Sequence, residues 1–276
     1  MRTIRGLALG CHPGPTVVVT TIAVALALGV GQSAAGSVLV AVTVLSGQLS
    51  IGWSNDWLDA RRDAVDGRVD KPVATGTISQ TLVKAAAFSA LTLCVPLSFL
   101  NGVSSGWAHL GLVGSGWSYN LGLKATLWSW LPYAVGFGLL PAFVTLGLPQ
   151  PVWPPWWVVV AGALLGVGAH FANVLPDIDT DLAHGLCGLP QRLGLLGAGW
   201  VAISLLSGAS VLLIVAPNGS PTTVMWLGTV SVLALLVVGA RSLLAGAKVS
   251  VVFVCAMAVA LVDVLLLAES ARVLRS

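Results

Sequence analysis

The chain has 276 residues, of which 57% are hydrophobic and only 8% are charged, and its net charge at neutral pH is +3. Soluble globular proteins carry about 25% charged residues, so this composition excludes a soluble fold and indicates an integral membrane protein. The small positive charge lies at the edges of apolar segments and indicates no nucleic-acid partner. We expect a single all-α membrane domain over residues 1–276.

Nine apolar segments follow one another along the chain, and each is long enough to cross about 30 Å of hydrocarbon as a helix. A basic start with Arg2 and Arg5 precedes the first segment, which is too long for a signal-peptide core and is expected to be retained. All the runs are also too long for β-barrel strands. The predicted spans cover residues 14–32, 36–54, 79–100, 105–123, 126–147, 152–172, 194–216, 222–240 and 248–268.

The basic residues alternate with the predicted spans. If the N-terminus is cytoplasmic, ten of them lie in or beside inner segments, and the outer loops around residues 33, 102, 150 and 219 hold none. The ten are Arg2, Arg5, Arg61, Arg62, Arg68, Lys71, Lys124, Arg192, Arg241 and Lys248. Lys84 lies near an inner end, and only Arg272 and Arg275, in the tail, break the pattern. The positive-inside rule therefore predicts a multi-pass plasma-membrane protein whose N-terminus and acidic segments face the cytoplasm.

The acidic residues are concentrated in two places. Of ten in the chain, five lie between Asp56 and Asp70, after the second predicted span, and three lie between Asp177 and Asp181, after the sixth. Both segments follow the pattern N-x3-D-x3-D-x3-G at a constant offset of 118 residues, starting at Asn55 and Asn173. This pseudo-repeat predicts a bundle in which two similar halves face each other across a central cavity.

The spacing within these segments indicates metal binding. Residues at i, i+4 and i+8 share one helix face, so Asn55, Asp59 and Asp63 point the same way, with Asp56 at the edge. Stacked oxygen ligands suit Mg²⁺, which completes its shell with water and substrate phosphates. We predict that Mg²⁺ is bound by Asn55, Asp56, Asp59, Asp63, Asp177 and Asp181. We predict that a diphosphate lies between the two stacks, contacted by Asn173 and by the basic residues Arg68, Lys71, Lys124 and Arg192.

These residues resemble the UbiA superfamily of intramembrane prenyltransferases. Asn55-Asp56-x2-Asp59-x3-Asp63, the continuation Asp66-Gly67-Arg68 and Lys71-Pro72, and Asp177-x3-Asp181 are similar to its two Asp-rich motifs, and Tyr119-x4-Lys124 to a tyrosine and lysine of its fourth helix. The resemblance implies nine helices around a cavity open sideways to lipid. It also implies Mg²⁺-dependent transfer of a prenyl group from an isoprenyl diphosphate to a lipophilic or aromatic acceptor.

The resemblance also implies residue roles. Asn55, Asp59, Asp63, Asp177 and Asp181 would handle Mg²⁺ and diphosphate. Arg68 and Lys124 would grip phosphate, and Tyr119 would stand near the reactive carbon. The second motif departs from the family pattern, because Val174 stands where many members have Asp and Pro176 interrupts the segment. We therefore expect a kinked second stack, and the number of Mg²⁺ ions stays open.

Three other functions are compatible with parts of this pattern. An intramembrane terpene cyclase would use the same diphosphate site, and a transporter would also hold charged residues and repeats. Asp63-x2-Asp66-Gly67 matches the start of a CDP-alcohol phosphotransferase motif, but Asp70-Lys71 stands where Ala-Arg is required. His12 precedes the first predicted span, where it could approach the acceptor or the diphosphate or have a capping or interfacial role. His170 lies one turn before Asn173 and either lines the cavity or is a hydrogen-bonded packing residue.

Overall fold

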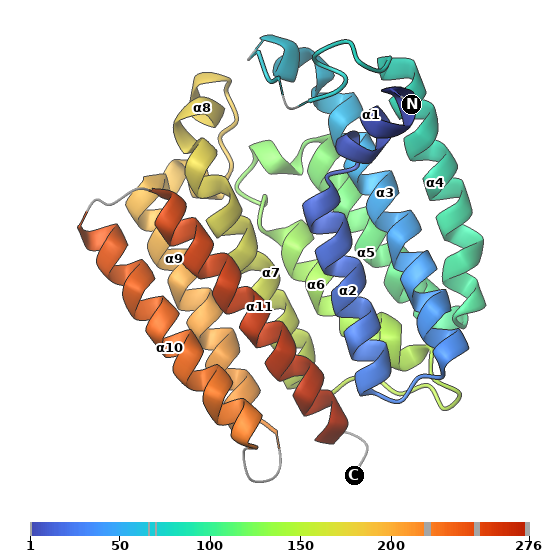
Figure 1. The fold of residues 1–276 in the computed structure, drawn as a ribbon, viewed down its shortest axis with the longest axis vertical. Helices are drawn as coiled ribbons and strands as arrows, with labels where there is room; N and C mark the ends of the chain where they lie inside the picture. Colours follow the sequence, from blue (N-terminus) through green and yellow to red (C-terminus); the bar gives the residue numbers. More distant parts are fainter. Residues whose placement is uncertain (1, 66, 70, 218–221, 246–248, 274–276) are drawn as a thin grey trace.

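The structure is a computed structural model that describes residues 2–65, 67–69, 71–217, 222–245 and 249–273. Asp66, Asp70, Lys248 and Arg275, which entered the sequence analysis, lie outside these ranges, as does the side chain of Arg272. Every regular element within the described ranges is helical. The long helices run side by side in one bundle (Figure 1).

The helices follow the apolar segments of the sequence. Eleven α-helices and two short 3-10 turns are formed by the described residues. The first half contains α1 (Arg2–Gly10), α2 (Pro13–Gly29), α3 (Ala34–Val65), α4 (Gln80–Leu100), α5 (Val103–Leu121) and the turn η1 (Leu123–Ala125). The second half contains α6 (Leu131–Leu146), α7 (Trp156–Val174), the turn η2 (Leu175–Asp177), α8 (Ile178–Ala183), α9 (Leu189–Val215), α10 (Thr223–Leu244) and α11 (Val249–Val273).

Several helices are long and apolar enough to cross a membrane. Among the described residues five meet this test, namely α3, α4, α7 together with α8, α9 and α10. The pair α1 and α2, bent by 64°, would be a sixth, and α6 and part of α11 are shorter apolar helices. The chain is therefore a multi-pass membrane protein, and the count of nine spans stays a prediction.

Two elements add to the predicted spans. The second predicted span ends at residue 54, and α3 continues to Val65, so that the first acidic motif lies on the same helix, as its spacing predicts. No glycine or proline interrupts the chain between Gly52 and Gly67, and an ion pair between Arg62 and Asp59, three residues apart, stabilises the last turns. The N-terminal residues also form a separate helix, α1, which we did not predict.

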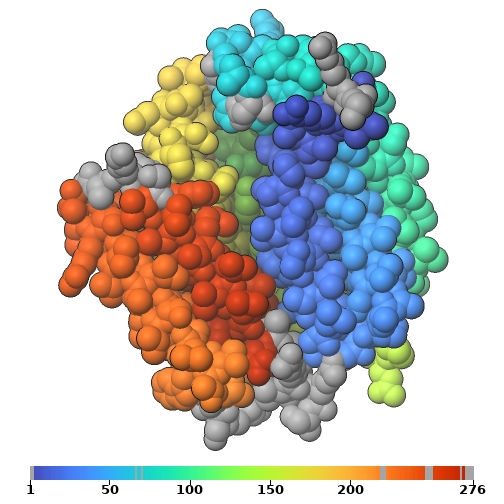
Figure 2. All heavy atoms as spheres, in the orientation of Figure 1, coloured from blue at the N-terminus to red at the C-terminus, as the bar shows by residue number. Residues whose placement is uncertain are grey.

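The acidic segments lie at one end of the bundle. In Figure 1 this is the end that carries α1, α8 and the segment after α3, and the last turns of α11 lie at the opposite end. Figure 2 shows that the surface between α2 and α11 is hollowed in the half nearer to the acidic end, with the middle of the chain visible as its floor. At the other end, Leu26, Val30 and Leu267 contribute to a small apolar pocket between α2, α6, α7 and α11.

Gly52 allows α3 to approach the segment between α1 and α2. A Cβ atom at Gly52 would lie 2.2 Å from the main-chain oxygen of Cys11. We expect Gly52→Ala to destabilise the protein by about 1–3 kcal/mol, because backbone has to move to admit the methyl group. The measurement is the Tm of the purified protein in detergent, which should fall by several degrees. Gly114→Ala is the matched control, since its Cβ would meet nothing within 4 Å, and an equal Tm for both variants would contradict the expectation.

Candidate active site

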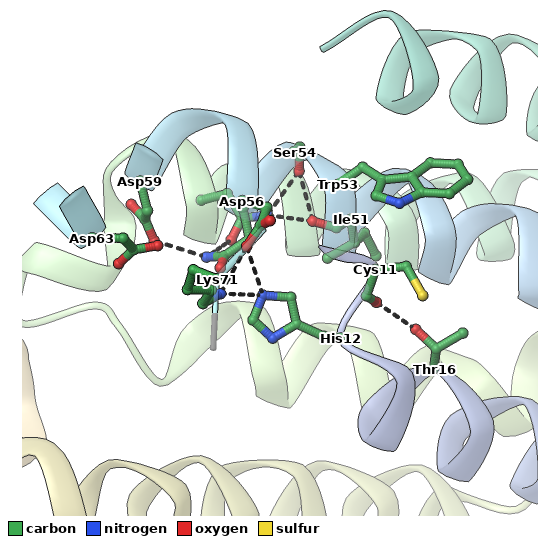
Figure 3. A network of polar contacts seen from close by, with 12 residues as sticks. Cys11, His12, Thr16, Ile51, Trp53, Ser54, Asp56, Asp59, Asp63 and Lys71 are labelled. Atoms are coloured by element: carbon green, nitrogen blue, oxygen red, sulfur yellow. Dashed lines mark hydrogen bonds and ion pairs between the residues drawn. The ribbon is translucent and has the colours of Figure 1, made fainter. Parts of the chain in front are cut away.

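The first acidic motif lies on the last turns of α3. Asn55, Asp56, Asp59 and Asp63 are all helical, as predicted. The three carboxylates have 1%, 8% and 4% of their surface exposed, respectively. Buried carboxylates are costly unless they are paired, so their partners define what the site can do. Figure 3 shows the cluster from close by.

Asp59 lies at the centre of the first cluster of charges. Lys124, in η1, donates from Nζ to both carboxylate oxygens and lies 2.6 Å from Oδ2. Arg62 Nη2 lies 2.8 Å from Oδ2, and Asn55 Nδ2 donates to the same oxygen over 3.1 Å. Burial lowers the pKa of Lys124, and the Asp59 carboxylate opposes that change. Lys124 and Asp59 thus come together as an ion pair from positions 65 residues apart.

Asp63 lies one turn further along the same face. Its Oδ1 atom is 4.0 Å from Arg62 Nη2, and the charges of Lys71 and of Arg68, both after the helix, also act on it. Arg62 therefore contacts both acidic residues of this face. The predicted contact of Arg68 with phosphate stays a prediction.

Asp56 has a different set of partners. Its Oδ1 atom accepts a hydrogen bond of 2.9 Å from Lys71 Nζ, and the same Nζ lies 2.9 Å from His12 Nε2 (Figure 3). Lys71, predicted to contact phosphate, is therefore engaged by a carboxylate of the motif itself. His12 comes from the segment between α1 and α2, so the N-terminal part of the chain contributes directly to the site.

The second acidic motif is divided between three elements. Asn173 lies at the end of α7, Asp177 ends the 3-10 turn η2, and Asp181 lies in α8. Pro176 lies inside η2, which interrupts the α-helix as the sequence predicted. Asn173 and Asp177 are exposed, and Asp181 is partly buried.

Asp181 is held by a residue of the following helix. Its Oδ2 atom accepts a hydrogen bond of 2.8 Å from Gln191 Nε2, at the start of α9. Arg192, predicted to contact phosphate, is exposed and donates from Nε to the main-chain oxygen of Cys187 over 2.8 Å. Arg192 therefore braces the loop between α8 and α9 in this structure.

The two motifs share electrostatic partners. Asp181 interacts electrostatically with both Arg62 and Lys124, the cations that pair with Asp59. The charges of Asp59 and Asp181 also act on the hydroxyl of Tyr119, at the end of α5. The place of Tyr119 near the reactive carbon, implied by the family resemblance, stays a prediction.

Aromatic rings pack together around Tyr119. The ring of Tyr119 meets those of Tyr133 and His170 edge-on, with centroids 5.2 Å and 5.6 Å away. Tyr133 stacks on His170 at 4.5 Å, and His170 Nε2 lies 3.3 Å from Ser129 Oγ. His170 is buried and packs against both tyrosines, so it holds their rings in place.

Sequence reasoning missed three polar residues of the site. Asn120 accepts from Asn55 Nδ2 over 3.2 Å and donates to Ser54 Oγ over 2.8 Å, which fixes the first motif against α5. Arg62 and Gln191 were not assigned to the site, although they contact Asp59 and Asp181. The available signal was position: Asn120 directly follows Tyr119, and Arg62 lies inside the first motif.

The donor set is suited to a hard divalent cation. Carboxylate and amide oxygens are the ligands that Mg²⁺ prefers. Asn55, Asp59 and Asp63 present them from α3, and Asp177 and Asp181 carry further carboxylates in η2 and α8. Among the described residues, no three His, Cys, Asp or Glu side chains already converge as a metal cluster. Arg62 and Lys124 balance the charge of the Asp59 carboxylate. The residues thus fit Mg²⁺ in chemistry.

Comparison with known proteins agrees with this geometry. A sequence profile of the UbiA prenyltransferase family matches residues 16–251. A search of curated proteins gives no match. An apo UbiA homologue from Aeropyrum pernix K1 superimposes with a TM-score of 0.75 at 18% identity, covering 91% of this chain and 95% of that one.

Two further solved structures share the fold at low identity. A UbiA homologue from Archaeoglobus fulgidus, bound to GPP and Mg²⁺, gives a TM-score of 0.73 at 16% identity, over 98% of this chain and all of that one. A digeranylgeranylglyceryl phosphate synthase in membranes gives 0.75 at 16% identity, over 99% of both chains. With its acidic segments on a shared helical fold, this chain belongs to the UbiA prenyltransferase family.

Proposed function

We propose that the protein catalyses the Mg²⁺-dependent transfer of a prenyl group from an isoprenyl diphosphate to a small acceptor, aromatic or quinone-like, within the membrane. The observation that carries the proposal is the cluster of buried carboxylates at the end of α3, where Arg62 and Lys124 pair with Asp59. The charges of the same two cations also act on Asp181 of the second motif. An anionic substrate between the motifs would meet these cations. Homologues from Archaeoglobus fulgidus bound to GPP and to DMAPP with Mg²⁺ support the choice of substrate class.

Each residue of the site has a proposed role in this reaction. Asn55, Asp59, Asp63, Asp177 and Asp181 would hold Mg²⁺, which neutralises charge on the leaving diphosphate when it is bound. Lys124 and Arg62 supply charge-assisted hydrogen bonds to phosphate oxygens. The C–O bond of the allylic diphosphate breaks, and the positive charge left on the prenyl group faces the ring of Tyr119, where a cation–π interaction stabilises it. The acceptor then forms the new bond to the prenyl group and gives its proton to the released diphosphate or to water.

The site also fits the membrane location that we propose. The acidic end of the bundle also carries the basic residues Arg62, Lys71 and Lys124. By the positive-inside rule this end faces the cytoplasm, and the membrane that we propose is the plasma membrane. The hollow between α2 and α11 gives the prenyl tail a route to the lipid (Figure 2). We also propose that nine membrane spans surround a central cavity.

Release of pyrophosphate tests the function. Purified protein in nanodiscs is supplied with one labelled prenyl diphosphate, with and without a mixture of aromatic and quinone acceptors. We expect pyrophosphate release and a labelled adduct only when both substrates are present. Release with a cyclised hydrocarbon and no acceptor would identify a terpene cyclase, the second candidate. Binding of the diphosphate without any turnover would contradict both enzymes.

A further inference from the structure

One carboxylate of the first motif contacts the N-terminal part of the chain. Asp56 leaves α3 about 100° around the helix from Asn55 and about 60° from Asp59, on the side where Asp63 follows two turns later. Its Oδ2 atom lies against the N-terminal elbow (residues 10–13), where a Cβ at Gly10 would be 2.9 Å away. Asp59 instead contacts Lys124 after α5. The two acidic residues therefore serve different neighbours.

Asp56 joins two segments at one buried point. Lys71 Nζ is 2.9 Å from Asp56 Oδ1 and 2.9 Å from His12 Nε2. An ammonium group only donates hydrogen bonds, so His12 Nε2 is the acceptor and the imidazole carries its proton on Nδ1. The side chain of His12 also hydrogen-bonds Asn55. These contacts link Lys71, in the segment after α3, to Asp56 and to His12 of the elbow. They also link His12 to Asn55, the first residue of the motif.

The elbow has an unusual backbone that its surroundings maintain. His12 has φ 54° and ψ 69°, and among the described residues it is the only non-glycine with a positive φ. Such a conformation persists where neighbouring contacts over-determine it. Trp53 Nε1 donates to the oxygen of Leu7 over 2.8 Å, and Thr16 Oγ1 donates to that of Cys11 over 2.8 Å (Figure 3). The local structure thus aims the His12 side chain at Lys71.

We propose that Asp56 is a positioning residue: it fixes Lys71 and His12 beside Asn55, and so holds the N-terminal elbow and the segment after α3 over the diphosphate site. The inference rests on the proposed function, because it concerns the same site. It replaces the sequence-based expectation that Asp56 binds Mg²⁺. Its Oδ1 atom is already engaged by Lys71, and Oδ2 is buried against the elbow, where no described residue forms a hydrogen bond with it.

A cation ligand and a positioning residue would respond differently when the charge of Asp56 is removed. A cation ligand, once removed, weakens metal binding whatever happens to Lys71. A positioning residue, once removed, leaves the buried ammonium of Lys71 without its carboxylate, and neutralising Lys71 as well relieves that defect. The pair Asp56 and Lys71 is therefore suited to a double-mutant cycle.

The experiment compares Asp56→Asn, Lys71→Met, the double variant and Asp59→Asn in the full-length protein. Mn²⁺ serves as an EPR probe of the cation site, and the Tm without substrate reports the contact itself. We expect Asp56→Asn to keep the Mn²⁺ affinity of the wild type and Asp59→Asn to lose at least about tenfold. The double variant should have a higher Tm than Asp56→Asn alone. In turnover, Asp56→Asn should raise the KM for prenyl diphosphate about tenfold, with a smaller change in kcat and none in the KM for the acceptor.

Clear outcomes would overturn the inference. A loss of Mn²⁺ affinity in Asp56→Asn equal to that in Asp59→Asn would make Asp56 a cation ligand. Strictly additive Tm changes would show that Asp56 and Lys71 are not coupled. If Asp56→Asn does not fold, Lys71→Met decides the question: a tighter Mn²⁺ site would show that Asp56, once released, binds the cation, whereas unchanged affinity supports positioning. The Tm cycle needs no turnover, so it tests the inference even if prenyl transfer is never observed.

Discussion

Replacing Asp59 by asparagine is expected to reduce prenyl transfer by about 10²–10³-fold, as the loss of a central electrostatic contact does in other active sites. Asp59 pairs with Lys124 and Arg62 and accepts from Asn55. The substitution removes a proposed Mg²⁺ ligand and also releases the two cations that would contact the diphosphate. Steady-state kinetics with saturating acceptor would measure the loss in kcat.

Asp179→Asn provides the matched control for this prediction. Asp179 belongs to the second acidic segment but is exposed in α8, off the face shared by Asp177 and the end of α7. We expect its turnover to stay close to that of the wild type. Equal losses in Asp59→Asn and Asp179→Asn would show that general negative charge, and not a specific cation site, matters. Full activity in Asp59→Asn would contradict the assignment of the first motif.

Removal of divalent cations is expected to abolish the reaction. Without them, the carboxylates of the two motifs would repel a diphosphate, and Lys124 and Arg62 are already neutralised by Asp59. Chelation with EDTA should reduce turnover to background, at least about 10³-fold, since cation stabilisation of the leaving group is worth several kcal/mol. Addition of Mg²⁺ in excess of the chelator should restore the rate.

The fold should survive this treatment. The bundle is held by apolar packing and main-chain hydrogen bonds, so we expect the Tm in EDTA to remain close to that in buffer. The test is parallel measurement of Tm and turnover across a Mg²⁺ titration. Turnover that persists after exhaustive chelation would contradict a Mg²⁺-dependent mechanism. A large fall in Tm would instead indicate that the cation has a structural role.

Much of the helical architecture could be read from the sequence, because glycine, proline and polar clusters mark where apolar runs end. The predicted segment 79–100 coincides closely with α4 (Gln80–Leu100), and 152–172 with α7 (Trp156–Val174). The exception is α1, whose apolar residues alternate with Arg2, Arg5 and small residues. A hydropathy run does not reveal such a helix, which depends on contacts such as the one from Trp53 to Leu7.

The site was predictable where it follows helical spacing and was not where it depends on tertiary contacts. The spacing of Asn55, Asp59 and Asp63 required only one continuous helix, which α3 supplies. The pairing of Asp56 with Lys71 depends on the path of a loop. The bond from Gln191 to Asp181 depends on how α9 returns to α8, and a residue pattern cannot specify that path. Pro176 is an intermediate case, because its effect on the helix is local and was anticipated.

The hollow between α2 and α11 has a consequence for the size of substrate that the protein can accept (Figure 2). An enzyme that encloses its substrate measures chain length by the depth of a closed pocket, and each added isoprene unit must find room inside. Here the tail of the proposed substrate would leave sideways after its first units, and surrounding lipid would solvate the rest. We therefore expect donors of different length to react at similar rates, with selectivity confined to the diphosphate, the first units and the acceptor.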